Sequence, residues 1–222
     1  MIDFAAARRM MVDGQVRTND VTDLRIIAAM QDIARERFVP AAKSSIAYLD
    51  RDVPLGGAPG RATRYLLKPM VLAKLLQIAE IGDTDLVLDV GCTTGYSSAL
   101  LAELADSVVA LEEDAELAAT ARRLLADHGA ANVEVVTGPL AAGWPAAAPY
   151  DVILLNGACE VVPRALLAQL DDGGRLVGVA GAGPDAKAML YRSAHGHVSG
   201  RPVFDAMAPL LPGFAAPVEF VF

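Results

Sequence analysis

The chain has 222 residues, of which 54% are hydrophobic, and a formal net charge of −8 at pH 7. This length fits one large domain, or a core domain with an N-terminal appendage, and the apolar content supports a sizeable core. The acidic balance argues against sequence-independent binding to nucleic acid, which needs a basic surface. No apolar segment approaches the ~18 uninterrupted residues of a membrane-spanning helix, and no signal peptide is evident. We therefore expect neither a nucleic-acid partner nor a membrane partner.

Cysteine and histidine usage bears on the compartment and on metals. Cys92 and Cys159 are the only cysteines, and each ends a predicted strand. We therefore expect no disulfide framework and a cytoplasmic location. The three histidines are spread out without paired Cys/His spacing, so no metal site is predicted. The segment 195–197 (HGH) is predicted to be an exposed hairpin turn.

Residues 1–68 are expected to form an N-terminal helical extension that ends in a functional loop, and residues 69–222 the main domain, within one compact unit. Apolar side chains recur at helical spacing in 3–16 and 23–35, which predicts two helices. Residues 41–67 are the least regular part, because prolines and glycines interrupt any long element. A loop of this length in a compact domain is usually functional or mobile.

Pro69 opens a predicted helix over 70–79, since proline is favoured at the first helical position. Beyond it, apolar strands alternate with helices, which predicts an α/β fold with a doubly wound, mostly parallel sheet covered on both faces. Segments 189–191, 198–204 and 218–222 are predicted to be antiparallel strands. The other expected elements are strand 86–90, helix 96–105, strand 107–111, helix 114–128, strand 133–137, strand 151–155, helix 162–170 and strand 175–180.

The turn at 91–95 (GCTTG) lies between a predicted strand and a predicted helix, an arrangement that surrounds a ligand with backbone N–H groups and the positive helix end. Glu112 ends the next strand about 20 residues on, where nucleotide-binding α/β folds grip ribose hydroxyls. Asp89 either orients the turn or meets an amino group of the ligand, or it caps the following helix. Asn156, at the end of the fourth strand, either lines the pocket or holds the loop that follows.

Six further segments stand in a fixed order along the chain. They are MVDGQVR at 11–17, RFVP at 37–40, AYLDRDVPLG at 47–56, GWP at 143–145, YDVI at 150–153 and LDDGGRLV at 170–177. In order and spacing this series resembles the protein-L-isoaspartate O-methyltransferase family, a branch of the S-adenosylmethionine-dependent methyltransferases with a Rossmann-like fold. The resemblance covers nearly the whole chain, whereas a glycine turn alone would be weak evidence.

The resemblance implies that S-adenosyl-L-methionine is the cofactor, that residues 69–222 bind it, and that residues 1–68 carry the active-site loop. It implies transfer of the sulfonium methyl to the side carboxylate of an isoaspartyl residue in a damaged peptide or protein, a protein-repair reaction. A carboxylate is already ionised at neutral pH, so catalysis would be positioning: an oxygen held ~3 Å from the methyl with water excluded. The cofactor contacts expected on this basis are Asp89, Gly91, Cys92, Thr93, Gly95, Tyr96, Glu112, Pro139, Leu140 and Asn156.

The chain departs from the family where the methyl acceptor is held. The family segment Gln-Thr-Ile-Ser-Gln-Pro reads RYLLKP here, so Leu67 stands at the serine position and Lys68 at the second glutamine. Leucine has no donor or acceptor with which to orient a carboxylate. Lys68 can pair with one, as can Arg61 or Arg64, although all three also fit an ordinary solvated loop face. Lys68 and Tyr65 are the candidates for positioning the acceptor.

Two departures concern the cofactor. Thr93 replaces the middle glycine of the family turn, and threonine resists positive φ and adds bulk. Either the turn is reshaped, or the hydroxyls of Thr93 and Thr94 contact the ligand. Pro139 replaces an aspartate that in the family reaches the adenine amino group. Loss of that hydrogen bond would cost about 1 kcal/mol or somewhat more, which weakens cofactor binding roughly tenfold without abolishing it.

These features predict a carboxyl methyltransferase of the isoaspartyl-repair type. One alternative is a methyltransferase with another acceptor, and a second is a non-catalytic relative that binds cofactor or a partner. The three departures favour the non-catalytic relative, whereas the retained Glu112 favours the enzyme. A nicotinamide dehydrogenase is a weaker alternative, because the chain contains no Gly-x-Gly-x-x-Gly and no paired catalytic histidine.

Overall fold

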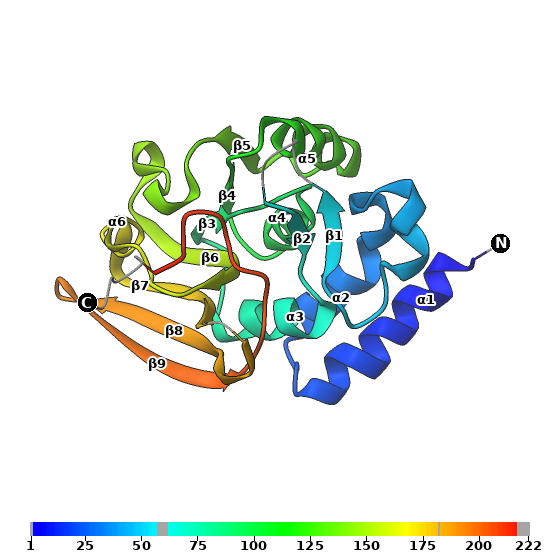
Figure 1. Cartoon of the computed structure of the whole chain (residues 1–222), viewed down its shortest axis with the longest axis horizontal. Helices are drawn as coiled ribbons and strands as arrows, with labels where there is room; N and C mark the ends of the chain where they lie inside the picture. Colours follow the sequence, from blue (N-terminus) through cyan, green and yellow to red (C-terminus); the bar gives the residue numbers. More distant parts are fainter. Residues whose placement is uncertain (1, 57–61, 182, 217–222) are drawn as a thin grey trace, which may run out of the picture.

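The computed structural model describes residues 2–56, 62–181 and 183–216. A central sheet of seven strands has the order β5-β4-β3-β6-β7-β8-β9, and a separate hairpin pairs β1 with β2 (Figure 1). The strands are β1 (Val53–Gly56), β2 (Arg64–Leu66), β3 (Leu86–Val90), β4 (Ser107–Glu112), β5 (Val133–Thr137), β6 (Tyr150–Cys159), β7 (Leu170–Ala180), β8 (Lys187–Ala194) and β9 (His197–Asp205).

The first five strands of the sheet order, β5 to β7, are parallel, and β8 and β9 continue antiparallel. This confirms the predicted α/β class with a mostly parallel sheet and antiparallel C-terminal strands. Strand β3 lies between β4 and β6, so the strand order reverses beside it. The carboxyl ends of parallel strands at such a reversal form the crevice where α/β folds bind ligands.

Six α-helices are described: α1 (Phe4–Met11), α2 (Leu24–Asp32), α3 (Pro69–Ile78), α4 (Tyr96–Ala102), α5 (Ala115–His128) and α6 (Arg164–Leu167). Helices α1 and α2 lie at the opposite side of the molecule from the β8–β9 hairpin, with α3 between them (Figure 1). Pro69 begins α3 as expected, and Asp114 caps α5 by accepting from the N–H groups of Glu116 and Leu117.

Side chains from the two faces of the sheet enter two separate cores. Val87 belongs to the larger core, which also takes in the N-terminal residues from Met11 onward, while its neighbour Leu88 belongs to the smaller core. The smaller core is closed by α6 and by the segment that follows β9, through Leu211 and Phe214. Alternate residues of one buried strand therefore serve opposite layers, which is why the strands are apolar throughout.

The expected strands 86–90 and 133–137 coincide with β3 and β5. The described part of 41–67 holds only short elements, as expected, and the β1–β2 hairpin among them was not predicted. Prolines and glycines do not prevent a short two-stranded ribbon at positions where they need not donate. The helix expected over 162–170 is only the single turn of α6, because Pro163 precedes it and β7 already begins at Leu170. The strand expected at 218–222 lies outside the described residues.

Several further expectations have structural outcomes. The turn at 195–197 joins β8 to β9 and is exposed, as predicted. Cys92 and Cys159 are buried and not bonded to each other. Over the described ranges, no helix is long and apolar enough to cross a membrane, and no group of His, Cys, Asp and Glu side chains is arranged to hold a metal.

Candidate active site

The glycine turn connects β3 to α4 with three left-handed residues in its five. Gly91 and Gly95 have φ of 84° and 95°, and Thr93 has φ of 55°. The turn is therefore not reshaped to suit a threonine; the threonine adopts the conformation that glycine tolerates best, at a cost of order 1–3 kcal/mol. The Thr93 hydroxyl is buried and has no hydrogen-bond partner in the described part of the chain. The Thr94 hydroxyl donates to the carbonyl of Phe38 at 2.6 Å.

Glu112 ends β4 beneath this turn and is fully buried. Its Oε2 accepts the backbone N–H of Thr93 at 2.9 Å, and its Oε1 accepts those of Glu113 and Asp114 at 3.0 and 3.1 Å. Burial raises the pKa of the Glu112 carboxyl, while Arg64 and the backbone donors oppose that rise. These contacts make Glu112 part of the turn's own framework.

Arg64, the first residue of β2, supplies the counter-charge. Its Nη1 donates to Glu112 Oε1 at 2.7 Å, and its Nη2 donates to the Gly91 carbonyl at 3.3 Å. Only 5% of the Arg64 side chain and none of the Glu112 side chain is exposed. The interpretation of Arg64 as a solvated loop residue is therefore wrong, because a buried carboxylate draws the guanidinium inward. Arg61 lies outside the described residues.

Asp89 and Asn156 link the turn to the start of α4. Asp89 Oδ2 accepts the hydroxyls of Ser97 and Ser98, in the first turn of α4, at 2.6 and 2.7 Å. Asn156 donates to the Gly91 carbonyl at 3.3 Å and to Ser97 Oγ at 2.7 Å. Asp89 Oδ1 and Asn156 Oδ1 are buried acceptors for which the described residues provide no donor. Burial raises the pKa of Asp89 to about 6, and the two serine hydroxyls oppose that rise.

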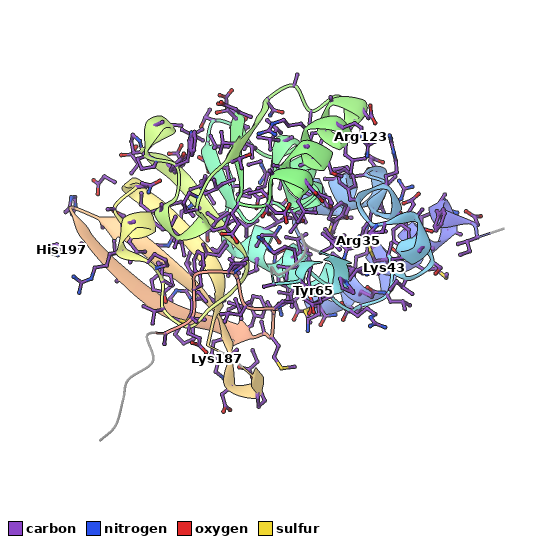
Figure 2. All side chains as sticks on the ribbon, turned by 45° about the horizontal axis from the view of Figure 1, so that its top comes forward. Arg35, Lys43, Tyr65, Arg123, Lys187 and His197 are labelled. Atoms are coloured by element: carbon purple, nitrogen blue, oxygen red, sulfur yellow. The ribbon has the colours of Figure 1, made fainter. Side chains whose placement is uncertain are left out.

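The turn also packs on the N-terminal extension. Tyr96 is fully buried, its ring centroid 5.5 Å from that of Phe38, and the Arg35 guanidinium carbon lies 4.8 Å above the Tyr96 ring. The interior position of Arg35, between the N-terminal elements and the sheet, is visible in Figure 2, whereas His197 lies far away at the end of the β8–β9 hairpin. Cys92 is buried, and its thiol pKa is raised well above the ordinary value by burial.

The space beside Gly91 is filled by side chains, whereas a pocket of about 300 Å³ is lined in part by Thr94 of the turn and by Phe38. A side-chain carbon at Gly91 would lie 2.7 Å from Arg64 Nη2 and 3.0 Å from a methyl carbon of Leu211. The cavity lined by Arg64, Asn156 and Leu211 measures about 10 Å³, far below the ~300–1,000 Å³ of small-molecule pockets. A groove of about 480 Å³ lies between α5 and β5, and Leu125, one of its lining residues, also lies beside Gly95.

The remaining predicted site residues lie at two places. Pro139 is exposed at the start of a short 3-10 turn after β5, and Leu140, inside that turn, is buried. Tyr65 and Leu67 line the small cavity together with Arg64. Leu67 is fully buried. Lys68 precedes α3, where its backbone N–H donates to Asp52. The structure thus brings Tyr65 and Leu67 to the same small cavity as Arg64 and Asn156.

Sequence reasoning missed the contact between Arg64 and Glu112 and the approach of Leu211. The two ends of the ion pair are 48 residues apart, and no periodicity links them. One signal was present: Glu112 ends an apolar strand, a carboxylate buried there needs a cation or several N–H donors, and Arg64 is one of the arginines in the earlier loop. Leu211 carries no such signal.

The hydrogen-bond acceptors at the turn fit the chemistry of S-adenosyl-L-methionine. The orphaned acceptors of Asp89 and Asn156 suit an ammonium group, and the Glu112 carboxylate suits ribose hydroxyls. The polar groups of the site match the cofactor in chemical type. The space for the cofactor at Gly91 is filled in this structure by the Arg64 and Leu211 side chains.

The chain was compared with protein families and with known relatives. The family model described as protein-L-isoaspartate(D-aspartate) O-methyltransferase matches residues 7–206. A protein-L-isoaspartate O-methyltransferase of Methanoculleus marisnigri is 40% identical over 174 residues, which cover 78% of this chain and 77% of the relative. A protein of the same name from Koribacter versatilis is 42% identical over 176 residues, with 78% and 76% covered.

Solved structures agree at the level of the fold. A structure named protein-L-isoaspartate O-methyltransferase superposes with a TM-score of 0.80 at 24% identity, covering 93% of this chain and 66% of that one. A putative protein-L-isoaspartate O-methyltransferase of Plasmodium falciparum, solved with S-adenosyl-L-homocysteine, gives 0.76 at 16% identity, with 92% and 97% covered. With the family model spanning both the N-terminal extension and the sheet, this chain belongs to the protein-L-isoaspartate O-methyltransferase family.

Proposed function

We propose that this protein transfers the methyl group of S-adenosyl-L-methionine to the side-chain carboxylate of isoaspartyl residues in damaged peptides or proteins. The observation that carries the proposal is the family match over residues 7–206, which includes the glycine turn and Glu112. The names of the relatives favour an enzyme of this type over the non-catalytic alternative and over a dehydrogenase. The predicted cytoplasmic location stays a prediction.

The residues around the turn are proposed to hold the cofactor. Glu112 would accept hydrogen bonds from the ribose hydroxyls. Asp89 Oδ1 and Asn156 Oδ1 would accept hydrogen bonds from the amino group of the methionine part. Both oxygens are buried acceptors without a donor in the described structure, which supports the assignment. Leu140 would contact the adenine as an apolar wall, while Pro139 offers no side-chain acceptor for its amino group. The other proposed contacts are Gly91, Cys92, Thr93, Gly95 and Tyr96.

The protein's task in this reaction is positioning. When bound, the cofactor supplies a methyl group carried on a sulfonium. A carboxylate oxygen of the acceptor forms a bond to the methyl carbon as the carbon–sulfur bond breaks, and no proton is transferred. An ionised acceptor needs no general base, so the residues of β2 and the turn must hold it in line and exclude water. The apolar walls formed by Leu67 and Leu211 support the exclusion of water.

The test has two stages. Calorimetric titration with S-adenosyl-L-homocysteine should detect binding, and absence of binding at millimolar ligand would refute the cofactor assignment. Transfer of labelled methyl from S-adenosyl-L-methionine to an isoaspartyl peptide, but not to its aspartyl isomer, should then be seen. Binding without transfer at high enzyme concentration would refute the isoaspartyl acceptor.

A further inference from the structure

The buried pair of Arg64 and Glu112 occupies the place where the proposed function needs a ligand. Glu112 accepts four N–H donors, three of which are backbone groups of the turn and of the β4–α5 loop. Those three cannot withdraw without dismantling the turn or the β4–α5 loop. Arg64 is the one side chain among these donors, and so the one that can leave.

The element that carries Arg64 is separate from the strands that carry the turn and Glu112. Strand β2 has three residues and pairs with β1 alone, outside the central sheet. The turn and Glu112 are anchored in the parallel sheet through β3 and β4. A displacement of Arg64 therefore breaks one ion pair and one contact to the Gly91 carbonyl, while the framework beneath it stays in place.

A guanidinium that leaves a buried carboxylate needs a new anion or water, because an isolated charge is costly in a dry site. Among the described residues that line the small cavity, Arg64 is the one that carries a charge; the others are Thr63, Tyr65, Leu67, Asn156, Pro209, Leu210 and Leu211. The proposed reaction brings a carboxylate, the methyl acceptor, to this cavity. Arginine is well matched to carboxylates, since its N–H groups form a fork.

We propose that Arg64 exchanges partners during the reaction: it neutralises Glu112 while the site is closed, and binds the acceptor carboxylate once the cofactor has taken Glu112. This inference rests on the proposed function and adds to it the residue that selects an anionic acceptor. It predicts opposite effects of Arg64 on the affinity for the cofactor and on the affinity for the acceptor. Arg64 competes with the cofactor for Glu112, and it contributes to the binding of the acceptor.

The size of the first effect follows from the population of the open site. If Arg64 keeps the site closed most of the time, the apparent dissociation constant exceeds the intrinsic one by the inverse of the open fraction. Removal of the guanidinium should then tighten cofactor binding. A residue that instead held the carboxylate of the cofactor would give the reverse result.

The decisive variant is Arg64→Met, which keeps an unbranched chain of similar length and removes the charge. Calorimetry with S-adenosyl-L-homocysteine should show binding at least about fivefold tighter than in the wild type. Initial rates with an isoaspartyl peptide should show a KM raised about tenfold or more. Arg64→Lys, which retains a cation, should lie between wild type and Arg64→Met in both measurements.

Two further variants serve as references, and thermal melting verifies that every variant is folded. Arg192→Met removes an exposed arginine of β8, which pairs with Glu80 after α3, and should change neither constant. Lys68→Met tests the other cation near the site, and a raised KM there with none in Arg64→Met would overturn the proposal. Unchanged or weaker binding of S-adenosyl-L-homocysteine by Arg64→Met, or an unchanged KM, would also overturn it.

Failure of the proposed function gives a different result. If the wild type binds S-adenosyl-L-homocysteine but methylates no isoaspartyl peptide, the proposed acceptor and the exchange are both wrong, whatever Arg64→Met binds. If the wild type methylates the peptide and Arg64→Met has the same dissociation constant and the same KM, the proposed function is retained and the exchange of partners by Arg64 is refuted.

Discussion

At the scale of single residues, Asp89 gives the fold a dependence on pH. Its carboxyl is fully buried, and burial raises its pKa from 3.8 to about 6. The folded state therefore holds the proton more tightly than the unfolded chain does. The resulting stabilisation is fully present below about pH 4 and is lost as the pH rises through 6, a change of about 2–3 kcal/mol.

Asp89→Asn should remove that dependence. Urea unfolding measured from pH 4 to 7 should show the wild type losing about 2–3 kcal/mol relative to the variant over this window. Asparagine keeps an oxygen that can accept from Ser97 or Ser98, so the turn should remain intact. Parallel curves for the two proteins would contradict the raised pKa.

Leu67 is the second residue for which a single change is informative. It lines the cavity at the turn, and a serine there would add a hydrogen-bond donor toward an acceptor carboxylate. Leu67→Ser should raise kcat/KM for an isoaspartyl peptide about fivefold, the worth of one net hydrogen bond. The same change should lower the free energy of unfolding by about 2–4 kcal/mol, because Leu67 is fully buried.

Assays of Leu67→Ser at a temperature where it remains folded separate the two effects. A lower or unchanged kcat/KM in folded protein would show that position 67 does not face the acceptor.

At the scale of elements, Arg35 joins three segments. Its Nε donates to the Ala47 carbonyl and its Nη2 to the Leu67 carbonyl, both at 2.7 Å, and its guanidinium lies over Tyr96 at the start of α4. Arg35→Met should lower the free energy of unfolding by about 3 kcal/mol, since two buried carbonyls lose their donors. Guanidinium chloride unfolding measures this, and Arg9→Met, at an exposed position of α1, should change stability by less than about 0.5 kcal/mol. A loss below about 1 kcal/mol in Arg35→Met would refute the joining role.

The elements also show what sequence patterns can predict. Strands β3 and β5 were predicted to the residue, since a buried apolar run between turn residues has few other interpretations. The β1–β2 hairpin was missed, because short strands rich in proline and glycine lack periodicity. The position of Glu112 followed from chain spacing, whereas its pairing with Arg64 depends on tertiary packing across 48 residues, which no local pattern encodes.

At the scale of the whole molecule, the larger core runs from Met11 to Ala206 and so joins the N-terminal extension to the sheet. We expect residues 1–68 and 69–222 to unfold together. Met30→Ala, in the fully buried face of α2, should lower the free energy of unfolding by about 2–5 kcal/mol. Far-UV circular dichroism and the fluorescence of Trp144, which packs against the other core, should report the same shifted midpoint.

Met10→Ala is the matched control, because that methionine is 68% exposed in α1 and should have little effect. If Met30→Ala moved the circular dichroism transition and left the Trp144 transition in place, the extension and the sheet would be separate folding units.

The hydrogen bond from the Thr94 hydroxyl to the Phe38 carbonyl ties the glycine turn to a segment that lies 56 residues earlier in the chain. Equilibria that share such a tie are reciprocal. If attachment of the segment around Phe38 favours a molecule bound at the turn, that molecule makes the segment harder to detach by the same free energy. Protection of the N-terminal extension from a protease then measures how much of the protein has a molecule bound at the turn. Substitutions in the extension would be detected first as a lower affinity of the turn for that molecule.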